Sequence, residues 1–190
     1  MKIAISGPSG SGKSTLAAEL AEKLGLRHVE IDALHHGPNW ESCGPDVLRE
    51  RVAAATAGDD WVTDSTYHTI LGRFIVDRAD VLVWLDPPAA IVIWRLIRRT
   101  YVRRRDKVVL WNGNVEAGMA AQIHWLFWPA LKKVFANRRE FPQLYRDVDV
   151  RRLRSDAEVR AFVQSIQATP TMSGSSIASE RQNTPPSVER

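Results

Sequence analysis

The run GPSGSGKST at residues 7–15 is the feature that most constrains the fold of this 190-residue chain. It fills every fixed position of the pattern G-x-x-x-x-G-K-[ST], with Gly7, Gly12, Lys13 and Ser14. A short apolar segment precedes it, and leucines at helical spacing follow it as far as the stop signal Gly25. Because strand, glycine-rich loop and helix are the context in which this pattern binds phosphate, the sequence predicts a phosphate-binding loop. A plain Gly/Ser turn is the less favoured alternative.

Each residue type in the loop has a physical reason to be there. Glycines let the backbone fold tightly, so that several N–H groups point at one cluster of phosphate oxygens. The helix that follows directs its positive end at the same place. Lys13 is expected to bridge the outer phosphates of a nucleoside triphosphate, and Ser14 to offer its hydroxyl to Mg²⁺. The predicted nucleotide-binding set is Gly7, Ser9, Gly10, Ser11, Gly12, Lys13, Ser14 and Thr15.

Strand-like and helix-like segments alternate along the rest of the chain. Strands are expected at 1–6, 28–31, 61–63, 81–85 and 148–153, and helices at 14–24, 45–57, 89–104 and 156–167. The clearest strands are apolar along their whole length, which is typical of a parallel sheet covered on both faces. The sequence therefore predicts one three-layer α/β domain over residues 1–167. The remainder, 168–190, is rich in Ser, Thr and Pro and is predicted to be a disordered tail.

Composition narrows the function classes. Cys43 is the only cysteine, which excludes an intramolecular disulfide and a cysteine-based zinc cluster. No stretch approaches a membrane span and no cleavable leader is recognised, so a cytoplasmic protein without a membrane partner is expected. The formal net charge of +4 comes from the second half, where the stretch from Arg95 to Lys107 is richest in arginine. Such a cluster favours a phosphate-bearing partner, either a small nucleotide or a nucleic acid.

Neither the N-K-x-D string of guanine recognition nor the L-S-G-G-Q string of transporters occurs. The chain resembles the adenylate kinase-type nucleoside and small-molecule kinases, and more closely the small ATP-binding proteins called topology modulation proteins. The resemblance covers roughly residues 1–165 and rests on GPSGSGKST, HVEIDALHH at 28–36, Trp40, WVTDSTY at 61–67, ADVLVWLD at 79–86, WRLIRRTYVRRR at 94–105 and LWNGNVE at 110–116. One departure is Asp64-Ser65-Thr66-Tyr67, where that group reads more like D-G-N-Y.

The resemblance implies a five-stranded parallel sheet in the order 2-3-1-4-5. It also implies a mobile lid at about residues 100–120 and a substrate region at about 34–58. ATP and Mg²⁺ are the ligands that such kinases use.

Acidic residues at the ends of predicted strands are candidates for the metal and the acceptor. Asp64 and Asp86 both follow apolar strands, and either could organise Mg²⁺ together with Ser14; the resemblance favours Asp64. Asp32 could accept the proton of a hydroxyl acceptor. A phosphate acceptor needs an arginine clamp instead, for which Arg73 is the candidate. Alternatively, the acidic residues cap a helix or turn, and Arg73 forms a surface salt bridge. Both classes of acceptor, hydroxyl and phosphate, therefore stay open.

The helix expected at 89–104 carries a row of arginines. Arg95, Arg99 and Arg103 are four residues apart and share one face, where they could neutralise phosphoryl charge. A solvated basic face is the alternative. The buried stripe of the same helix is expected to be Ile91, Trp94, Ile97 and Tyr101. Candidate substrate-pocket residues are His35, Trp40, Tyr67 and Arg73.

The sequence thus predicts an ATP- and Mg²⁺-dependent kinase that phosphorylates a small nucleotide or a hydroxyl-bearing metabolite. Its predicted catalytic residues are Lys13, Asp32, Asp64, Arg95, Arg99 and Arg103. A nucleic-acid-associated ATPase that uses the basic second half is the main alternative, although no helix-turn-helix, zinc-finger or RNA-binding signature supports it. A nucleotide-regulated binding protein without transfer activity is a third. Monomer and dimer both remain open.

Overall fold

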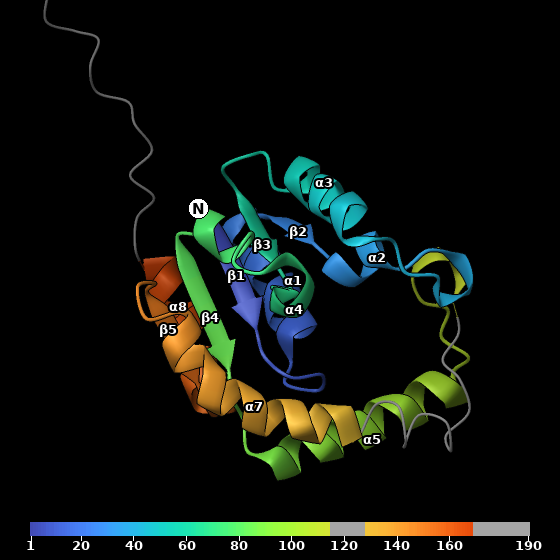
Figure 1. Cartoon of the computed structure of the whole chain (residues 1–190). Helices are drawn as coiled ribbons and strands as arrows, with labels where there is room; N and C mark the ends of the chain where they lie inside the picture. The colour runs from blue at the N-terminus through green and yellow to red at the C-terminus, as the bar shows by residue number, and fades with distance from the viewer. Residues whose placement is uncertain (115–127, 169–190) are drawn as a thin grey trace, which may run out of the picture.

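A computed structural model describes residues 1–114 and 128–168 (Figure 1). Five strands form one sheet in the order β2-β3-β1-β4-β5, and every neighbouring pair is parallel. The strands are β1 (Lys2–Ser6), β2 (Arg27–Val29), β3 (Trp61–Thr63), β4 (Val81–Leu85) and β5 (Val150–Leu153). The predicted fold class and the sheet order implied by the resemblance are confirmed.

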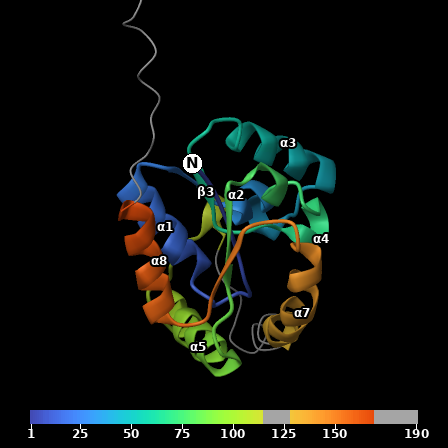
Figure 2. The ribbon, with the colours of Figure 1, turned by 90° about the vertical axis from the view of Figure 1, so that its left-hand side faces the viewer.

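Helices cover both faces of the sheet (Figure 2). One face carries α1 (Lys13–Leu24) and α8 (Asp156–Ala168), and the other carries α3 (Pro45–Ala55), α4 (His68–Leu71) and α7 (Trp128–Leu144). The helix α5 (Ala89–Arg105) runs beside α7 past the carboxyl ends of β1 and β4 (Figure 1). Shorter elements are α2 (Ile31–His35), η1 (Pro38–Trp40), η2 (Val76–Arg78) and η3 (Trp111–Gly113).

The apolar strands explain why two layers of helices are needed. Successive side chains of a strand point to opposite faces, so a strand that is apolar throughout must be covered twice. In β4, Leu82 and Trp84 pack in the cluster under α3, α4 and α7. Val83 and Leu85 pack in the cluster under α1 and α8.

Three details of the expected elements are wrong. The second strand ends at Val29, so Asp32 lies in the first turn of α2 rather than at a strand end. The spacing of the helix expected at 45–57 predicts that Val47, Leu48, Val52 and Ala55 face inward, but in α3 the buried residues are Leu48 and Val52, and Val47 is exposed. Asp32 nevertheless lies near the end of β2, because α2 begins two residues after that strand.

The third correction concerns the stripe of α5. Its predicted buried residues are exposed, Trp94 to 61%. The buried side of the helix is formed instead by Val92, Leu96 and Thr100. Apolar residues recur at helical spacing on two sides of this helix, and the choice falls to the side that packs on Val134 of α7. The periodicity alone could not decide between them.

The predicted tail lies outside the described residues from 169 onwards, as do residues 115–120 of the predicted lid. None of the helices in the described ranges combines the length and the apolar character needed to cross a bilayer.

Candidate functional site

The glycine-rich loop between β1 and α1 has the backbone shape that its sequence predicts. Gly12, the residue before α1, has φ 100° and Gly10 has φ 84°, both in the left-handed region that favours glycine. A Cβ on Gly10 would lie 2.8 Å from Cγ of Leu96 and 2.9 Å from the carbonyl oxygen of Val92, both in α5. The absence of a side chain at Gly10 therefore lets α5 pack directly against the loop.

Ser14 of the loop and Asp64 after β3 are held together. The Ser14 hydroxyl donates a hydrogen bond of 2.9 Å to Oδ2 of Asp64, and the backbone N–H of Ile31 donates to Oδ1 at 3.1 Å. Asp64 is 3% exposed, and this burial raises the pKa of its carboxyl group, against the opposing effect of the two hydrogen bonds. The loop lysine, Lys13, donates from Nζ to the carbonyl oxygen of Pro8 at 3.0 Å.

The other strand-end acid, Asp86, has different partners. It is buried and accepts hydrogen bonds from Arg138 of α7 at 2.7 Å and from Arg152 of β5 at 2.6 Å. These pairs join α7 and β5 to the end of β4, and no side-chain cap of α5 is formed. Of the two acids that the sequence leaves open for the metal, Asp64 is the one beside Ser14.

The arginine row of α5 faces the loop. Arg95 donates from Nη1 to the carbonyl oxygen of Ser11 at 3.1 Å and from Nη2 to Asp156 of α8 at 2.7 Å. Arg99 reaches Oγ of Ser9 at 3.5 Å. Both line the same pocket as Arg103, together with Arg98. Arg95 and Arg99 therefore contact the loop, whereas the alternative of a solvated basic face would leave them in solvent alone.

The loop and the arginines line a pocket of about 1120 Å³. Residues 64–70 after β3 also line it, with Asp32 of α2 and Asn137 of α7. Single small-molecule sites typically have volumes of roughly 300–1,000 Å³. The pocket is therefore large enough for a nucleotide and a second small molecule.

Asp32 and Tyr67 meet in this pocket. The Tyr67 hydroxyl donates a hydrogen bond of 2.7 Å to Oδ1 of Asp32. Burial, followed by the charge of Asp32, raises the pKa of the Tyr67 phenol, so the phenol keeps its proton and remains a donor. Tyr67 has φ 43°, an unusual backbone conformation for a residue with a bulky side chain, at the start of α4.

His35 and Trp40 do not line the pocket. His35 is buried behind Tyr67, with its ring centroid 5.1 Å from that of Tyr67, and burial lowers the pKa of its imidazole. Trp40 lies in η1, and its backbone N–H donates to the side chain of Asn114 at 3.0 Å. Both are therefore neighbours of the pocket rather than part of its wall.

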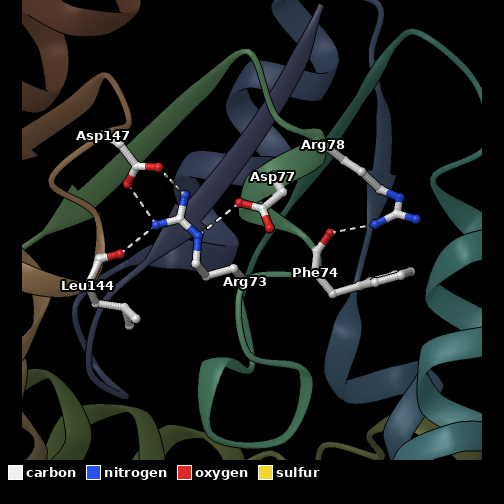
Figure 3. Close-up of polar contacts among 6 residues, drawn as sticks. All are labelled: Arg73, Phe74, Asp77, Arg78, Leu144 and Asp147. Atoms are coloured by element: carbon white, nitrogen blue, oxygen red, sulfur yellow. Dashed lines mark hydrogen bonds and ion pairs between the residues drawn. The ribbon is translucent and has the colours of Figure 1, made fainter.

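Arg73 does not line the pocket, and its side chain contacts Asp77, Leu144 and Asp147 instead (Figure 3). Its guanidinium group forms a two-bond pair with Asp147, at 2.8 and 2.9 Å, and a further bond with Asp77 at 2.9 Å. It also donates to the carbonyl oxygen of Leu144 at 2.7 Å. At Arg73 the structure thus shows the alternative salt bridge, which ties η2 to the end of α7.

The described part of the predicted lid contacts the substrate region. Trp111 of η3 donates from Nε1 to the carboxylate of Glu30, and Asn112 donates to the carbonyl oxygen of His36. Asn114 donates to the carbonyl oxygen of Gly37 at 2.9 Å. Residues after α5 thus reach across to η1, which Figure 1 shows beside η3.

Asn137 is a pocket residue that the sequence did not reveal. It is 2% exposed, lines the pocket, and its amide nitrogen has no hydrogen-bond partner among the described residues. The only local signal is its spacing: with Val134 and Phe141 it shares the inward side of α7, where an amide interrupts an apolar stripe. No motif marks that position.

Comparisons with known proteins agree with this geometry. A family model described as cytidylate kinase matches residues 3–42. The chain is 32% identical to the cytidylate kinase of Natronomonas pharaonis over 115 residues, which are 52% of this chain and 58% of that protein. The same identity and coverage hold for the cytidylate kinase of Halorubrum lacusprofundi. The chain thus spans little more than half the length of the curated relatives it matches.

Solved structures resemble this chain in fold over most of its length, although their sequences differ from it. A shikimate kinase from Acinetobacter baumannii superimposes with a TM-score of 0.50 at 21% identity, covering 87% of this chain and 89% of that one. A deoxyadenosine kinase from M. mycoides gives 0.51 at 15% identity, covering 88% and 100%. These likenesses concern the fold. The loop, the sheet order and these matches together make the chain similar to the P-loop small kinases.

Proposed function

We propose that this chain is an ATP-dependent phosphotransferase that transfers the γ-phosphoryl group of ATP to a small acceptor. The observation that carries the proposal is the shared pocket: the loop, the Ser14–Asp64 pair, the arginine row of α5 and Asp32 all line it. Phosphoryl transfer needs positioned phosphates, a metal and positive charge more than covalent chemistry. The similarity to cytidylate kinases supports the same reaction class.

In this proposal the loop N–H groups and Lys13 hold the phosphates of ATP. Lys13 lies against the carbonyl oxygen of Pro8, within the loop, and a bound phosphate would offer it a charged partner instead. The positive end of α1 adds to the attraction.

The residues beside the loop fit Mg²⁺. Ser14 and Asp64 offer a hydroxyl and a carboxylate, the oxygen ligands that this ion takes with water and substrate phosphates. A cation would also offset the burial that raises the pKa of Asp64. When bound, Mg²⁺ supplies positive charge to the β- and γ-phosphates.

Arg95, Arg99 and Arg103 would neutralise charge on the transferring group. Arg95 is already oriented by Ser11 and Asp156, so little ordering is required when ATP binds. The direction of this row toward the pocket favours the phosphates of a small nucleotide over those of a polymer.

Labelled-phosphate transfer from ATP to nucleosides, nucleotides, sugars and small hydroxy acids tests the proposal. Wild-type protein should label at least one acceptor, and Lys13→Ala should label none while remaining folded. Hydrolysis of ATP only in the presence of DNA, with binding that weakens steeply as salt is raised, would instead favour the nucleic-acid-associated ATPase.

A further inference from the structure

The Lys and Arg side chains of the pocket are gathered in one part of its lining. Every Lys and Arg among its described lining residues comes from the loop or from α5: Lys13, Arg95, Arg98, Arg99 and Arg103. The lining from α2, α7 and residues 65–70, here called the acceptor side, offers the polar groups of Ser65, Thr66, Tyr67, His68, Thr69 and Asn137, together with the carboxylate of Asp32. The loop and α5 thus hold the Lys and Arg charges, near the carboxylates of Glu19, Asp64 and Asp156, whereas the described residues of the acceptor side include the carboxylate of Asp32 and no Lys or Arg.

Three arginines outside the pocket lining, on the elements around β3 and β4, are already paired. Arg138 and Arg152 both hold the buried carboxylate of Asp86, and Arg73 holds Asp147 and Asp77. Taking Arg138 or Arg152 away for an anionic acceptor would leave Asp86 buried with less compensation, which is costly. A phosphate acceptor would also face the like charge of Asp32.

Asp32 is placed to act on a proton. Its Oδ1 atom accepts a hydrogen bond from the Tyr67 hydroxyl, whereas no protein donor contacts its Oδ2 atom within the described ranges. The backbone of Tyr67 has the unusual φ of 43°, the kind of local strain that recurs at functional sites. One carboxylate oxygen is therefore fixed by the protein and the other can face a substrate hydroxyl.

Asn137 adds a second polar group on this side. Its buried amide nitrogen lacks a partner in the described part of the chain, and buried donors are normally satisfied. It stands one turn before Phe141, whose ring packs on that of His68 in the segment that follows Tyr67. An oxygen atom of an uncharged acceptor would accept a hydrogen bond from this amide nitrogen.

We infer that the acceptor is an uncharged hydroxyl compound, that Asp32 is its general base, that Tyr67 is a positioning residue, and that Asn137 donates a hydrogen bond to it. The inference rests on the proposed function and names the acceptor class. The acceptor hydroxyl oxygen forms a bond to the γ-phosphorus while the bond from that phosphorus to the β,γ-bridging oxygen breaks. The hydroxyl proton passes to Oδ2 of Asp32, and the electron pair of the broken bond leaves with ADP.

Matched acceptor pairs test the charge preference. Each nucleoside is compared with its 5′-monophosphate, cytidine with CMP among them, and each sugar with its phosphate, using labelled ATP. The uncharged member of a pair should be the better acceptor by about tenfold or more in kcat/KM, which corresponds to about 1.4 kcal/mol. Preferred transfer to CMP or another monophosphate would overturn the inference and leave the proposed function standing. No transfer to any member, with ATP still bound, would overturn both.

Variants test the roles without knowledge of the natural acceptor, because water is itself a hydroxyl acceptor and slow ATP hydrolysis can be followed. Asp32→Asn should lower hydrolysis by about 10²–10⁴-fold, the usual contribution of a general base. The Kd for ATP, read from the change in intrinsic tryptophan fluorescence when ATP enters the pocket beside Trp94, should stay the same. Arg73→Gln is the matched control and should leave both unchanged.

Tyr67→Phe tests whether Tyr67 positions Asp32 for the reaction or only stabilises the fold. Loss of the hydrogen bond that fixes Oδ1 of Asp32 should lower the kcat for transfer while the KM of ATP stays unchanged. Asn137→Leu should raise the KM of the acceptor with the KM of ATP unchanged. An unaltered kcat in Tyr67→Phe, or an equal rise of both KM values in Asn137→Leu, would contradict the assignment of that residue.

Discussion

The Ser14 hydroxyl hydrogen-bonds Oδ2 of Asp64 at 2.9 Å, joining the phosphate-binding loop to the end of β3 across 50 positions of sequence. The contact exists because β1 and β3 are neighbouring parallel strands, so their carboxyl ends meet at one edge of the sheet. It brings a hydroxyl and a buried carboxylate to one place, where oxygen ligands for Mg²⁺ are needed.

Asp64→Asn should therefore raise the Mg²⁺ concentration required for ATP hydrolysis. The neutral amide keeps the size of the side chain and removes its charge, and the expected rise is about 10–100-fold, as for partners that tune a metal site. Titration of hydrolysis with Mg²⁺ measures it. Asp86→Asn is the comparison variant: it should destabilise the fold through Arg138 and Arg152 and leave the Mg²⁺ requirement unchanged.

Gly10→Ala should weaken both the fold and ATP binding. The new Cβ would meet Leu96 and the Val92 carbonyl below 3.0 Å, and φ 84° disfavours alanine, so α5 must move from the loop. Overpacking of this kind costs about 1–3 kcal/mol, measured by urea unfolding. Gly58→Ala, with nothing near its Cβ, is the control and should change little. Equal effects of the two variants would argue against close packing of α5 on the loop.

Two arginine variants should separate catalysis from stability. Arg95→Gln removes a charge that faces the loop and should slow transfer by about 10³-fold, as charge-stabilising arginines do in phosphoryl transfer. Arg73→Gln removes the contacts to Asp147 and Asp77 and should lower the melting temperature while sparing kcat. Steady-state kinetics and thermal unfolding of both variants measure this. A comparable loss of kcat in Arg73→Gln would restore its assignment to the substrate.

Stability should fall in mildly acidic solution because of His35. Burial lowers the pKa of its imidazole below the usual 6.5, so the folded state takes up a proton less readily than the unfolded state. The contribution to stability is complete above pH 6.5 and is lost as the pH falls through the lowered pKa. Urea unfolding across this range should show the decline, and His35→Asn should flatten it. If stability declined equally steeply with falling pH in His35→Asn, titratable groups other than His35 would be the cause of the decline.

Much of the fold was predictable because its signals are local. The loop pattern, the apolar centre of β1, the wholly apolar β4 and the helix stop at Gly25 act within a few residues of sequence, and each was placed correctly. Strand order was not visible in any local pattern; it was implied by the resemblance to known kinases.

The sequence by itself determined a phosphate-binding loop, a parallel sheet and an arginine-rich helix, because backbone geometry and hydrophobic periodicity depend on nearby residues. Only the tertiary structure decided that Asp64 meets Ser14, that Asp86 and Arg73 are consumed by ion pairs, and that Asn137 faces the pocket. A charge pairs with whatever the fold brings near it, and Ser14, Arg138 and Asp147 lie 50 to 74 residues from Asp64, Asp86 and Arg73. Which acid meets the loop is thus a property of strand order rather than of sequence pattern.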